Sequence, residues 1–338
     1  MKMYDGNGYV NMQDLIRSGF PFIMVVGGRG TGKTYGSLQD VLTEQEEGLI
    51  NRFLYLRRMQ TETDMVGNQA LSPFKKLNAD KGWNITSKSI RQSVYGFFRE
   101  DALIGYAASL STFRNLRGFD FSDVDIIIYD EFIPEAGARP IKHEAQSLFN
   151  VYESINRNRE LSGDPPVRLV CLSNSNELGN PIFMELGIIS KLEKMSMQGG
   201  GTLRDRSRGL MVVLLKDSPI SNKKKQTALY KLTGSSSFTG MALENTFIDN
   251  DRDGIKPQSL VEYILETTID GIAIYKHKSS PTYYICNYSG VPEYTTNERD
   301  LERWQLRYYY LFNRYIDGQL YFEDYLTKRL FLMYNKGR

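Results

Sequence analysis

The sequence has few residues of several kinds, and each shortage excludes a class of protein. It holds only 2 cysteines and 11 prolines among 338 residues. Two cysteines cannot build a disulfide framework, so we expect a protein of the reducing cytosol. The longest apolar run near the middle is residues 210–215, far short of the roughly 20 residues that a membrane-spanning helix needs. We therefore expect no membrane partner. Residues 1–6 contain no long apolar run, so we expect no secretory signal.

The chain also carries almost no net charge. Its 42 Lys and Arg residues stand against 40 Asp and Glu residues, which gives a formal charge of +2. This balance does not indicate a polyanionic partner, so any contact with nucleic acid must come from local positive charge. The length, with 41% hydrophobic residues, excludes disorder over most of the chain and predicts two domains with a core each.

One motif stands out among the residues that are present. Residues 27–34 read GGRGTGKT and fit the phosphate-binding pattern G-x-x-x-x-G-K-[ST]. The apolar run 22–26 before them predicts a buried parallel strand, and an apolar helical stripe starts at Leu38. The turn would surround phosphates with backbone N–H groups, Lys33 would reach the β- and γ-phosphates, and Thr34 would hold Mg²⁺. The predicted nucleotide-binding residues are Gly27, Gly28, Arg29, Gly30, Thr31, Gly32, Lys33 and Thr34.

An acidic pair at the end of a second apolar run predicts the remaining half of a nucleoside triphosphatase site. Residues 126–129 read as a buried strand, and Asp130 and Glu131 follow at the end where ligands bind in open α/β sheets. Asp130 suits the Mg²⁺ shell, and Glu131 suits orienting and deprotonating the attacking water. The adjacent Glu favours hydrolysis over transfer. A P-loop kinase is one alternative, and a P-loop adaptor that binds ATP as a structural ligand is another.

A predicted helix and a further strand add candidate residues. Residues 145–155 predict the helix, which ends near Arg157 and Arg159, and residues 167–172 predict a strand that ends beside Asn174. Asn174 is either a γ-phosphate sensor or the start of a turn. The two arginines either complement the helix dipole or reach a neighbouring subunit's phosphates as an arginine finger.

The spacing of the two motifs favours one subclass of P-loop protein. Strand-like runs at residues 53–56, 94–98 and 103–106 lie between Lys33 and Asp130 in the chain. We therefore expect at least one strand between the two motif strands. That order resembles the additional-strand (ASCE) class, which includes RecA-like and terminase-like motors. The sequence lacks an Asn-Lys-x-Asp base-reading motif, which disfavours a GTPase. The expected fold is an α/β motor domain with a parallel sheet.

Five blocks of sequence together resemble the DNA-packaging ATPases of phi29-like tailed bacteriophages, which are terminase-like encapsidation motors. The blocks are residues 27–34, 55–58, 128–133, 156–160 and 171–174. The resemblance implies a homo-oligomeric ring, a pentamer in that family, which hydrolyses ATP with Mg²⁺ and pumps double-stranded DNA into a procapsid through its portal. It places the protein in the cytoplasm of the infected bacterial host and transiently at the portal vertex. Whether a packaging RNA takes part stays open.

The same resemblance assigns roles to single residues. The catalytic residues that it implies are the loop arginine Arg29, the catalytic Glu131, the trans-acting finger Arg157 and the sensor Asn174. Arg117 falls where the family has a second basic residue that acts on a neighbour's nucleotide. The family's lysine after the Arg-Arg pair is replaced here, because Met59 and Gln60 follow Arg58. That substitution weakens the case that this loop grips DNA through charge.

Residues 201–243 are expected to form a basic linker after a motor domain of residues 1–200. Eight Lys and Arg residues against two Asp give residues 201–231 a local charge of +6. This stretch is either a solvated linker or an element that contacts phosphates on the DNA or portal side.

Residues 244–338 predict a small α+β domain. A hairpin is expected from residues 271–276 and 282–286, followed by a helix over 301–312. The family resemblance makes this domain RNase H-like. Its scattered acids, Asp270, Asp300, Asp317 and Asp324, do not assemble into a metal-binding triad. We expect a vestigial domain that docks to the portal or to nucleic acid, and a terminase-like motor with an active nuclease is the alternative.

Overall fold

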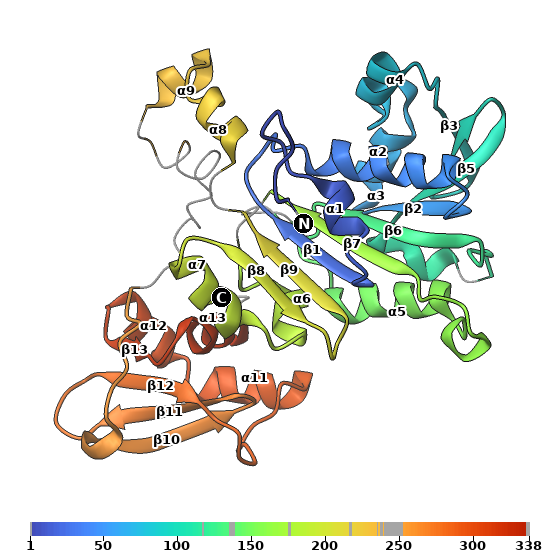
Figure 1. Cartoon of the computed structure of the whole chain (residues 1–338). Coiled ribbons are helices and arrows are strands. Elements are labelled where there is room, and N and C mark those ends of the chain that lie inside the picture. The colour runs from blue at the N-terminus through green and yellow to red at the C-terminus, as the bar shows by residue number, and fades with distance from the viewer. Residues whose placement is uncertain are drawn as a thin grey trace. The chain divides into compact units, whose positions relative to one another are not determined.

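The chain forms two compact units, each built around its own sheet (Figure 1). The computed structural model describes residues 2–116, 118–134, 139–174, 177–215, 218–234, 236, 239 and 253–335. The first unit comprises the residues up to 185 and those from 194 to 239. The second unit comprises residues 186–193 and 253–335.

Among the described residues, nine strands form the sheet of the first unit, in the order β3-β4-β5-β2-β6-β7-β1-β9-β8. Their bounds are β1 Phe22–Val26, β2 Arg52–Arg57, β3 Thr86–Arg91, β4 Val94–Arg99, β5 Ala102–Ser109, β6 Val124–Asp130, β7 Arg168–Ser173, β8 Gly201–Asp205 and β9 Leu210–Leu214. The central strands from β5 to β9 are parallel, whereas β3, β4 and β8 run antiparallel to their neighbours.

The strand between the two motif strands is β7. It pairs with β1, which precedes the phosphate-binding motif, and with β6, which ends in Asp130. One intervening strand is therefore confirmed, but its source differs from our expectation. The runs 53–56, 94–98 and 103–106 form β2, β4 and β5 on the far side of β6. The intervening strand instead follows both motifs in the chain, and it carries Asn174 just beyond its end.

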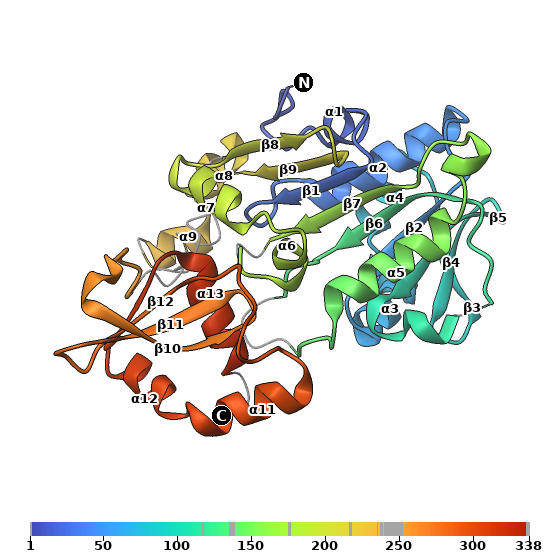
Figure 2. The ribbon, with the colours of Figure 1, turned by 90° about the horizontal axis from the view of Figure 1, so that it is seen from below.

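Helices cover both faces of this sheet, as a mostly parallel sheet requires. Figures 1 and 2 show α2 on one face and α5 on the other. Apolar side chains of α2, such as Leu38 and Val41, are fully buried with those of β1 and β6 in one core. The helices of this unit are α1 Met12–Ile16, α2 Lys33–Glu46, α3 Gln60–Gly67, α4 Lys75–Lys81, α5 Glu144–Asn156, α6 Pro181–Glu185, α8 Pro219–Lys224 and α9 Ala228–Thr233. A further helix, α7 Ile189–Met197, includes residues of both units.

The expected basic linker is wrong for residues 201–214. These residues form the β8–β9 hairpin, and β9 pairs in parallel with β1 inside the main sheet. The reason is the apolar run Leu210–Leu214, which is buried along its whole length. The arginines of the basic stretch occupy the edge strand β8 and the turn after it, where charged side chains protect a sheet edge.

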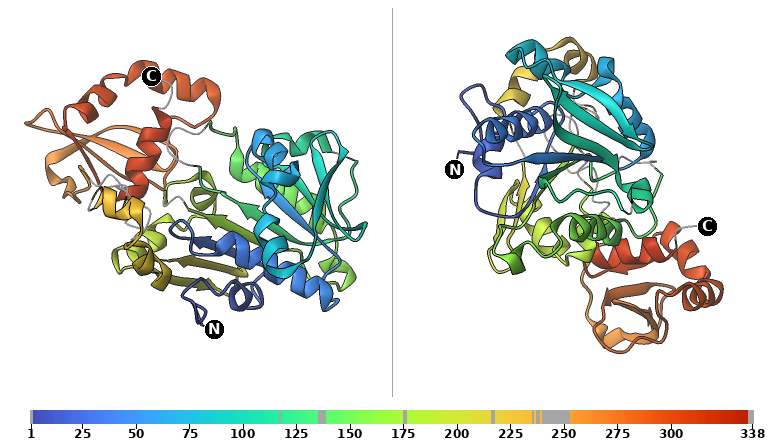
Figure 3. Two further views of the ribbon diagram at one scale, coloured as in Figure 1. Left: turned by 90° about the horizontal axis from the view of Figure 1, so that it is seen from above. Right: turned by 90° about the vertical axis from the view of Figure 1, so that its right-hand side faces the viewer.

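In the described part of the second unit, four strands form a sheet with helices on one side (Figures 1 and 3). The strands β10 Tyr263–Ile269, β11 Ile272–His277, β12 Tyr283–Asn287 and β13 Leu320–Phe322 lie in chain order. The β11–β12 pair confirms the expected hairpin. Ile272, Ile274 and Ile285 share a core with Trp304 and Phe331. The expected helix over 301–312 is two helices, and the set is α11 Glu298–Arg307, α12 Tyr310–Ile316 and α13 Tyr325–Tyr334.

Some sequence-based predictions fall on residues that the structure does not describe. Arg117, Lys216 and Asp217 lie outside the described residues. Within the described part of the chain, no helix has the length and apolar character that a membrane crossing requires.

Candidate nucleotide-binding site

The phosphate-binding loop connects β1 to α2, as the motif predicts. Gly30 and Gly32 have φ angles of +69° and +91°, in the left-handed region that favours glycine. Gly32 is also the N-cap of α2, so the helix begins at Lys33 with its first N–H groups directed into the loop. The backbone therefore has the curvature and the N–H donors that a phosphate chain needs.

Lys33 is folded back into this loop. Its Nζ atom lies 2.7 Å from the carbonyl oxygen of Gly27, 2.9 Å from that of Gly28 and 2.8 Å from Oδ1 of Asn174. The side chain is buried, and burial lowers its pKa to about 8 even though Glu131 and Asp130 act in the opposite direction. The hydrogen-bond acceptors described for this buried ammonium are all neutral, which fits a site for phosphate oxygens, since these would bind it more strongly.

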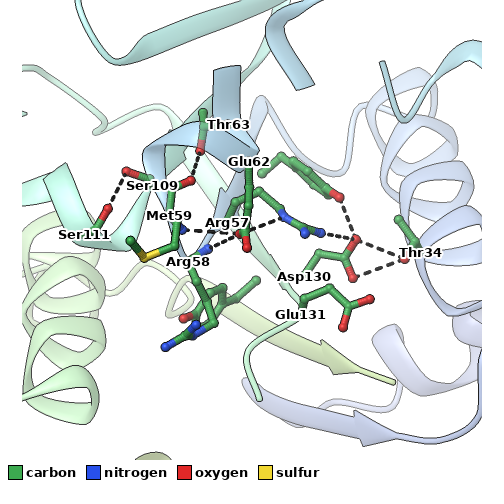
Figure 4. A network of polar contacts seen from close by, with 12 residues as sticks. Thr34, Arg57, Arg58, Met59, Glu62, Thr63, Ser109, Ser111, Asp130 and Glu131 are labelled. Carbon is green, nitrogen blue, oxygen red and sulfur yellow. Dashed lines mark hydrogen bonds and ion pairs between the residues drawn. The ribbon is translucent and has the colours of Figure 1, made fainter. Parts of the chain in front are cut away.

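Asp130 collects three polar side chains around its carboxylate (Figure 4). The Thr34 hydroxyl lies 3.1 Å from both carboxylate oxygens, and the Tyr55 hydroxyl donates a 2.6 Å hydrogen bond to Oδ2. Arg57 Nη1 approaches the same oxygen at 3.4 Å. Thr34 and Asp130 therefore stand together as a hydroxyl–carboxylate pair of the kind that holds Mg²⁺ beside phosphates.

Tyr55 and Arg57 also belong to this site, although no sequence motif assigns them to it. Both lie on β2, which pairs with β6, and residues two apart on a strand point to the same face. Burial and the nearby Asp130 raise the pKa of Tyr55 well above its ordinary value, so its hydroxyl stays a proton donor. The block 55–58 contains the pattern that could have predicted them. Tyr55 and Arg57 are alternate residues near the end of an apolar run, and such residues share one face of a strand.

Glu131 follows in a strained conformation. Its φ angle of +60° lies in the left-handed region, which is rare for a residue with a side chain and is common at functional sites. Burial raises the pKa of its carboxyl group, and the neighbouring Asp130 adds to the effect. The Asn174 side-chain amide donates a hydrogen bond to Glu131, so Asn174 joins Glu131 to Lys33.

The structure distinguishes the candidate arginines. Arg157 is exposed, has a φ angle of +47°, and pairs at 3.5 Å with the exposed Asp120. Arg159 is anchored, since it lies 2.7 Å from Asp125 and donates to the Ser122 carbonyl at 2.8 Å. The contacts described for Arg157 involve no residue of the phosphate loop of its own chain.

Arg29 is exposed at the rim of the loop. The structure thus brings together Lys33, Thr34, Asp130, Glu131 and Asn174, with the loop residues 27–32 around them. It does not bring Arg157 to them.

The arginine that directly follows β2 in the chain holds the start of α5. Arg58 is buried and binds Glu144 through two hydrogen bonds, with Nε to Oε1 at 2.6 Å and Nη2 to Oε2 at 2.9 Å. The Tyr129 hydroxyl, from β6, donates to the same carboxylate at 3.2 Å. The two adjacent arginines therefore have different contacts. Arg57 approaches Asp130, whereas Arg58 fixes the start of α5, the helix that ends just before Arg157.

The residues of this site define the chain as a P-loop protein. They are a phosphate loop with its buried lysine, a hydroxyl–carboxylate pair and an adjacent Glu. The family model of the podovirus DNA encapsidation protein (Gp16) matches residues 4–268, and the chain belongs to this family. The resemblance to the packaging ATPases of phi29-like phages is thereby confirmed.

Individual relatives agree with this family. The chain is 25% identical over 231 residues to the DNA packaging protein of Bacillus phage B103, a match that spans 68% of this chain and 64% of that protein. It is 24% identical over 258 residues to the DNA packaging protein of Bacillus phage phi29, over 75% of this chain and 70% of that protein. The chain thus matches less than two thirds of the length of the B103 protein.

Two solved structures share the fold over almost the whole chain. One is the phi-28 gp11 DNA packaging motor, with a TM-score of 0.67 and 19% identity over 98% of this chain and 99% of that one. The other is the bacteriophage phi29 viral genome packaging motor assembly, with the same TM-score, the same shares of the two chains and 20% identity. At these identities the likeness establishes the fold.

Proposed function

We propose that this chain is an ATP-hydrolysing motor that moves double-stranded viral DNA into a procapsid. One observation carries the proposal: in a chain of the DNA encapsidation family, Lys33, Asp130 and Asn174 lie together at the same edge of the sheet, at or just after the ends of three adjacent strands. The strand order, with β7 between β1 and β6, supports the additional-strand class of P-loop ATPase.

Each residue of the site has a separate role in the proposed hydrolysis of ATP. The loop Gly27–Thr34 binds the phosphates, with Arg29 at its rim. Thr34 and Asp130 hold Mg²⁺, which supplies charge neutralisation at the β- and γ-phosphates when bound. Glu131 orients the attacking water and accepts its proton, and the raised pKa of its carboxyl group suits that role. Asn174 senses the γ-phosphate, because it contacts both Lys33 and Glu131.

The active assembly is a ring of identical subunits, a pentamer as in the phi29-like family. Arg157 reaches the nucleotide of the neighbouring subunit as a trans-acting finger, which its exposure and its strained backbone support. Arg117 is the second proposed trans-acting residue. The partners are double-stranded DNA, the portal and the procapsid, in the cytoplasm of the infected bacterial host and transiently at the portal vertex. A packaging RNA is a further candidate partner.

The motor domain extends beyond residue 200, because the β8–β9 hairpin completes its sheet. We propose that residues 253–335 belong to a C-terminal domain that is RNase H-like by family resemblance, is vestigial as a nuclease and docks to the portal or to nucleic acid. Three of its acids are engaged locally. Asp270 accepts hydrogen bonds from Thr296, Asp300 accepts one from the Thr295 hydroxyl, and Asp324 caps α13. The alternative is an active nuclease, which metal-dependent cutting of plasmid DNA would reveal.

The decisive experiment is ATP turnover and DNA packaging with matched proheads, with and without packaging RNA. We expect double-stranded DNA and proheads to raise ATP turnover, and the Lys33→Ala variant to abolish turnover and packaging. ATP turnover that neither DNA nor proheads change would contradict the motor. Binding of ATP without any turnover would indicate the structural adaptor, and phosphate transfer to an acceptor would indicate the kinase.

A further inference from the structure

The short helix α8 is fastened to the phosphate loop through the N-terminal segment. The Ser218 hydroxyl, at the N-cap of α8, donates a 2.9 Å hydrogen bond to the carbonyl oxygen of Gly8. Two residues further along that segment, the Val10 N–H donates at 2.9 Å to the carbonyl oxygen of Thr31 in the loop. Residues 8–10 therefore link the start of α8 to the loop.

The last residue of α8 reaches the loop itself. Lys224 Nζ donates a 2.7 Å hydrogen bond to the carbonyl oxygen of Arg29. It also lies so close to Gly30 that a Cβ atom built there would be 1.9 Å from it. Lys224 is half-buried in this position, whereas Lys223 and Lys225 on either side of it are exposed. Of three consecutive lysines, one is thus directed at the phosphate loop.

Two ammonium groups then approach one anion-binding loop. Burial lowers the pKa of Lys224, and the positive charge of Lys224 contributes to the lowered pKa of Lys33. The acceptor described for Lys224 is a neutral backbone carbonyl, and charge-assisted hydrogen bonds to phosphate oxygens are roughly twice as strong as neutral ones. A bound polyphosphate would relieve the repulsion between the two lysines and offer Lys224 a stronger partner.

We propose that Lys224 is a second phosphate-binding lysine, supplied by α8 of the same subunit, which exchanges the Arg29 carbonyl for the terminal phosphate of a bound nucleoside triphosphate. The inference rests on the proposed binding of ATP by the loop. The position of α8 would then depend on the nucleotide. With a diphosphate bound, Lys224 has no terminal phosphate to bind and keeps its hydrogen bond to the Arg29 carbonyl.

The test measures nucleotide affinity of the full chain with a non-hydrolysable ATP analogue and with ADP. We expect Lys224→Ala to weaken binding of the ATP analogue roughly tenfold, the size of one lost charge-assisted hydrogen bond, and to change ADP binding less than threefold. Lys223→Ala removes the same charge from the same helix and should leave both affinities unchanged. Lys224→Arg should restore most of the lost affinity.

The outcomes separate this inference from the proposed function. If Lys224→Ala and Lys223→Ala bind the ATP analogue with equal affinity, the proposed role of Lys224 is wrong. In that case, binding of the analogue by the wild-type chain still leaves the proposed function intact. An equal loss for the ATP analogue and ADP overturns the assignment to the terminal phosphate. A folded wild-type chain that binds neither nucleotide contradicts the proposed function itself. Thermal unfolding checks that each variant is folded, and Lys224→Gln replaces any variant that is not.

Discussion

The side-chain amide of Asn174 donates a hydrogen bond to the carboxylate of Glu131. The oxygen of the same amide accepts from Lys33 Nζ at 2.8 Å. Because Lys33 would bind phosphate, the occupant of the loop determines whether Asn174 still has Lys33 as a partner. The position of Glu131, the proposed base, thus depends on the phosphates through one side chain.

This arrangement predicts that Asn174 affects catalysis more than binding. We expect Asn174→Ala to lower kcat for ATP hydrolysis about a hundredfold, in the range of a lost positioned hydrogen bond in an active site, with nucleotide affinity within about threefold. Steady-state turnover and equilibrium binding measure the two effects. Glu131→Gln is the matched comparison and should show the same division. Wild-type turnover in Asn174→Ala would show that Asn174 only starts a turn.

Tyr55 predicts a specific effect on the metal. Its hydroxyl donates to Asp130 Oδ2 at 2.6 Å, and loss of a hydrogen bond that orients a metal ligand commonly costs 10–100-fold in metal affinity. We expect Tyr55→Phe to raise the Mg²⁺ concentration for half-maximal ATPase activity about tenfold. Tyr106→Phe removes a similar hydroxyl from β5 of the same sheet, one that is bonded to Asp123 and not to Asp130, and should leave this concentration unchanged. If both variants need the same Mg²⁺ concentration for half-maximal activity, Tyr55 does not contribute to metal binding.

The core of the site was predictable because its signals are local. The loop 27–34 and the pair Asp130 and Glu131 combine an apolar run with polar residues at its end, and such patterns are visible in one sequence. Asn174 followed from the same reasoning. Buried strands such as β6 were predictable for the same reason, because residues buried on both faces are apolar throughout.

Other features of the fold and the site could not be predicted, because they depend on contacts between segments that are distant in the sequence. Lys224 and the loop residue Arg29 are 195 positions apart, so no spacing rule connects them. The sequence predicts a linker where the β8–β9 hairpin lies, because charged residues on an edge strand give the same pattern as charged residues on a solvated segment. The sequence predicts a strand around Tyr55 and Arg57. Their approach to Asp130, however, depends on how β2 pairs with β6, which the sequence does not show.

The two arginines after α5 should respond differently to substitution. Arg157→Ala should leave thermal stability unchanged and lower ATPase activity about a thousandfold, as loss of an arginine finger does. Arg159→Ala should instead destabilise the fold by about 1–2 kcal/mol, because it breaks the pair with Asp125. Thermal unfolding and ATP turnover distinguish the two.

Mixed rings test whether Arg157 acts in trans. Subunits with Arg157→Ala and subunits with Lys33→Ala should partly restore turnover when mixed, because a neighbour with an intact arginine can serve an intact loop. Assembled mixed rings without any recovered turnover would contradict a trans-acting finger.

The buried pair Arg58–Glu144 should contribute to stability far more than a surface pair. Both side chains are nearly inaccessible, so Glu144→Gln would leave a buried guanidinium without its countercharge. We expect a loss of about 3–5 kcal/mol in the free energy of unfolding, measured with denaturant. Glu46→Gln breaks the exposed pair with Arg99 and should cost less than about 1 kcal/mol. Equal losses would mean that Arg58 finds other partners.

Nucleotide binding should be coupled to proton uptake through Lys33. Burial lowers the pKa of the free lysine to about 8, and phosphate oxygens next to the ammonium would raise it in the complex. Below pH 7 the lysine is protonated in both states, so it adds no pH dependence. Above pH 8 the free protein has lost the proton that the complex retains, so affinity falls as pH rises, by up to about tenfold per pH unit.

Calorimetry at pH 8.5, in two buffers with different ionisation enthalpies, measures this proton directly. We expect net uptake of a fraction of one proton per nucleotide at pH 8.5 and almost none from Lys33 at pH 7. The Lys33→Arg variant keeps its charge over the whole range, so its residual affinity should not change with pH. Binding by the wild-type chain that is independent of pH up to 9.5 would show that the Lys33 ammonium is not the group that meets the phosphates.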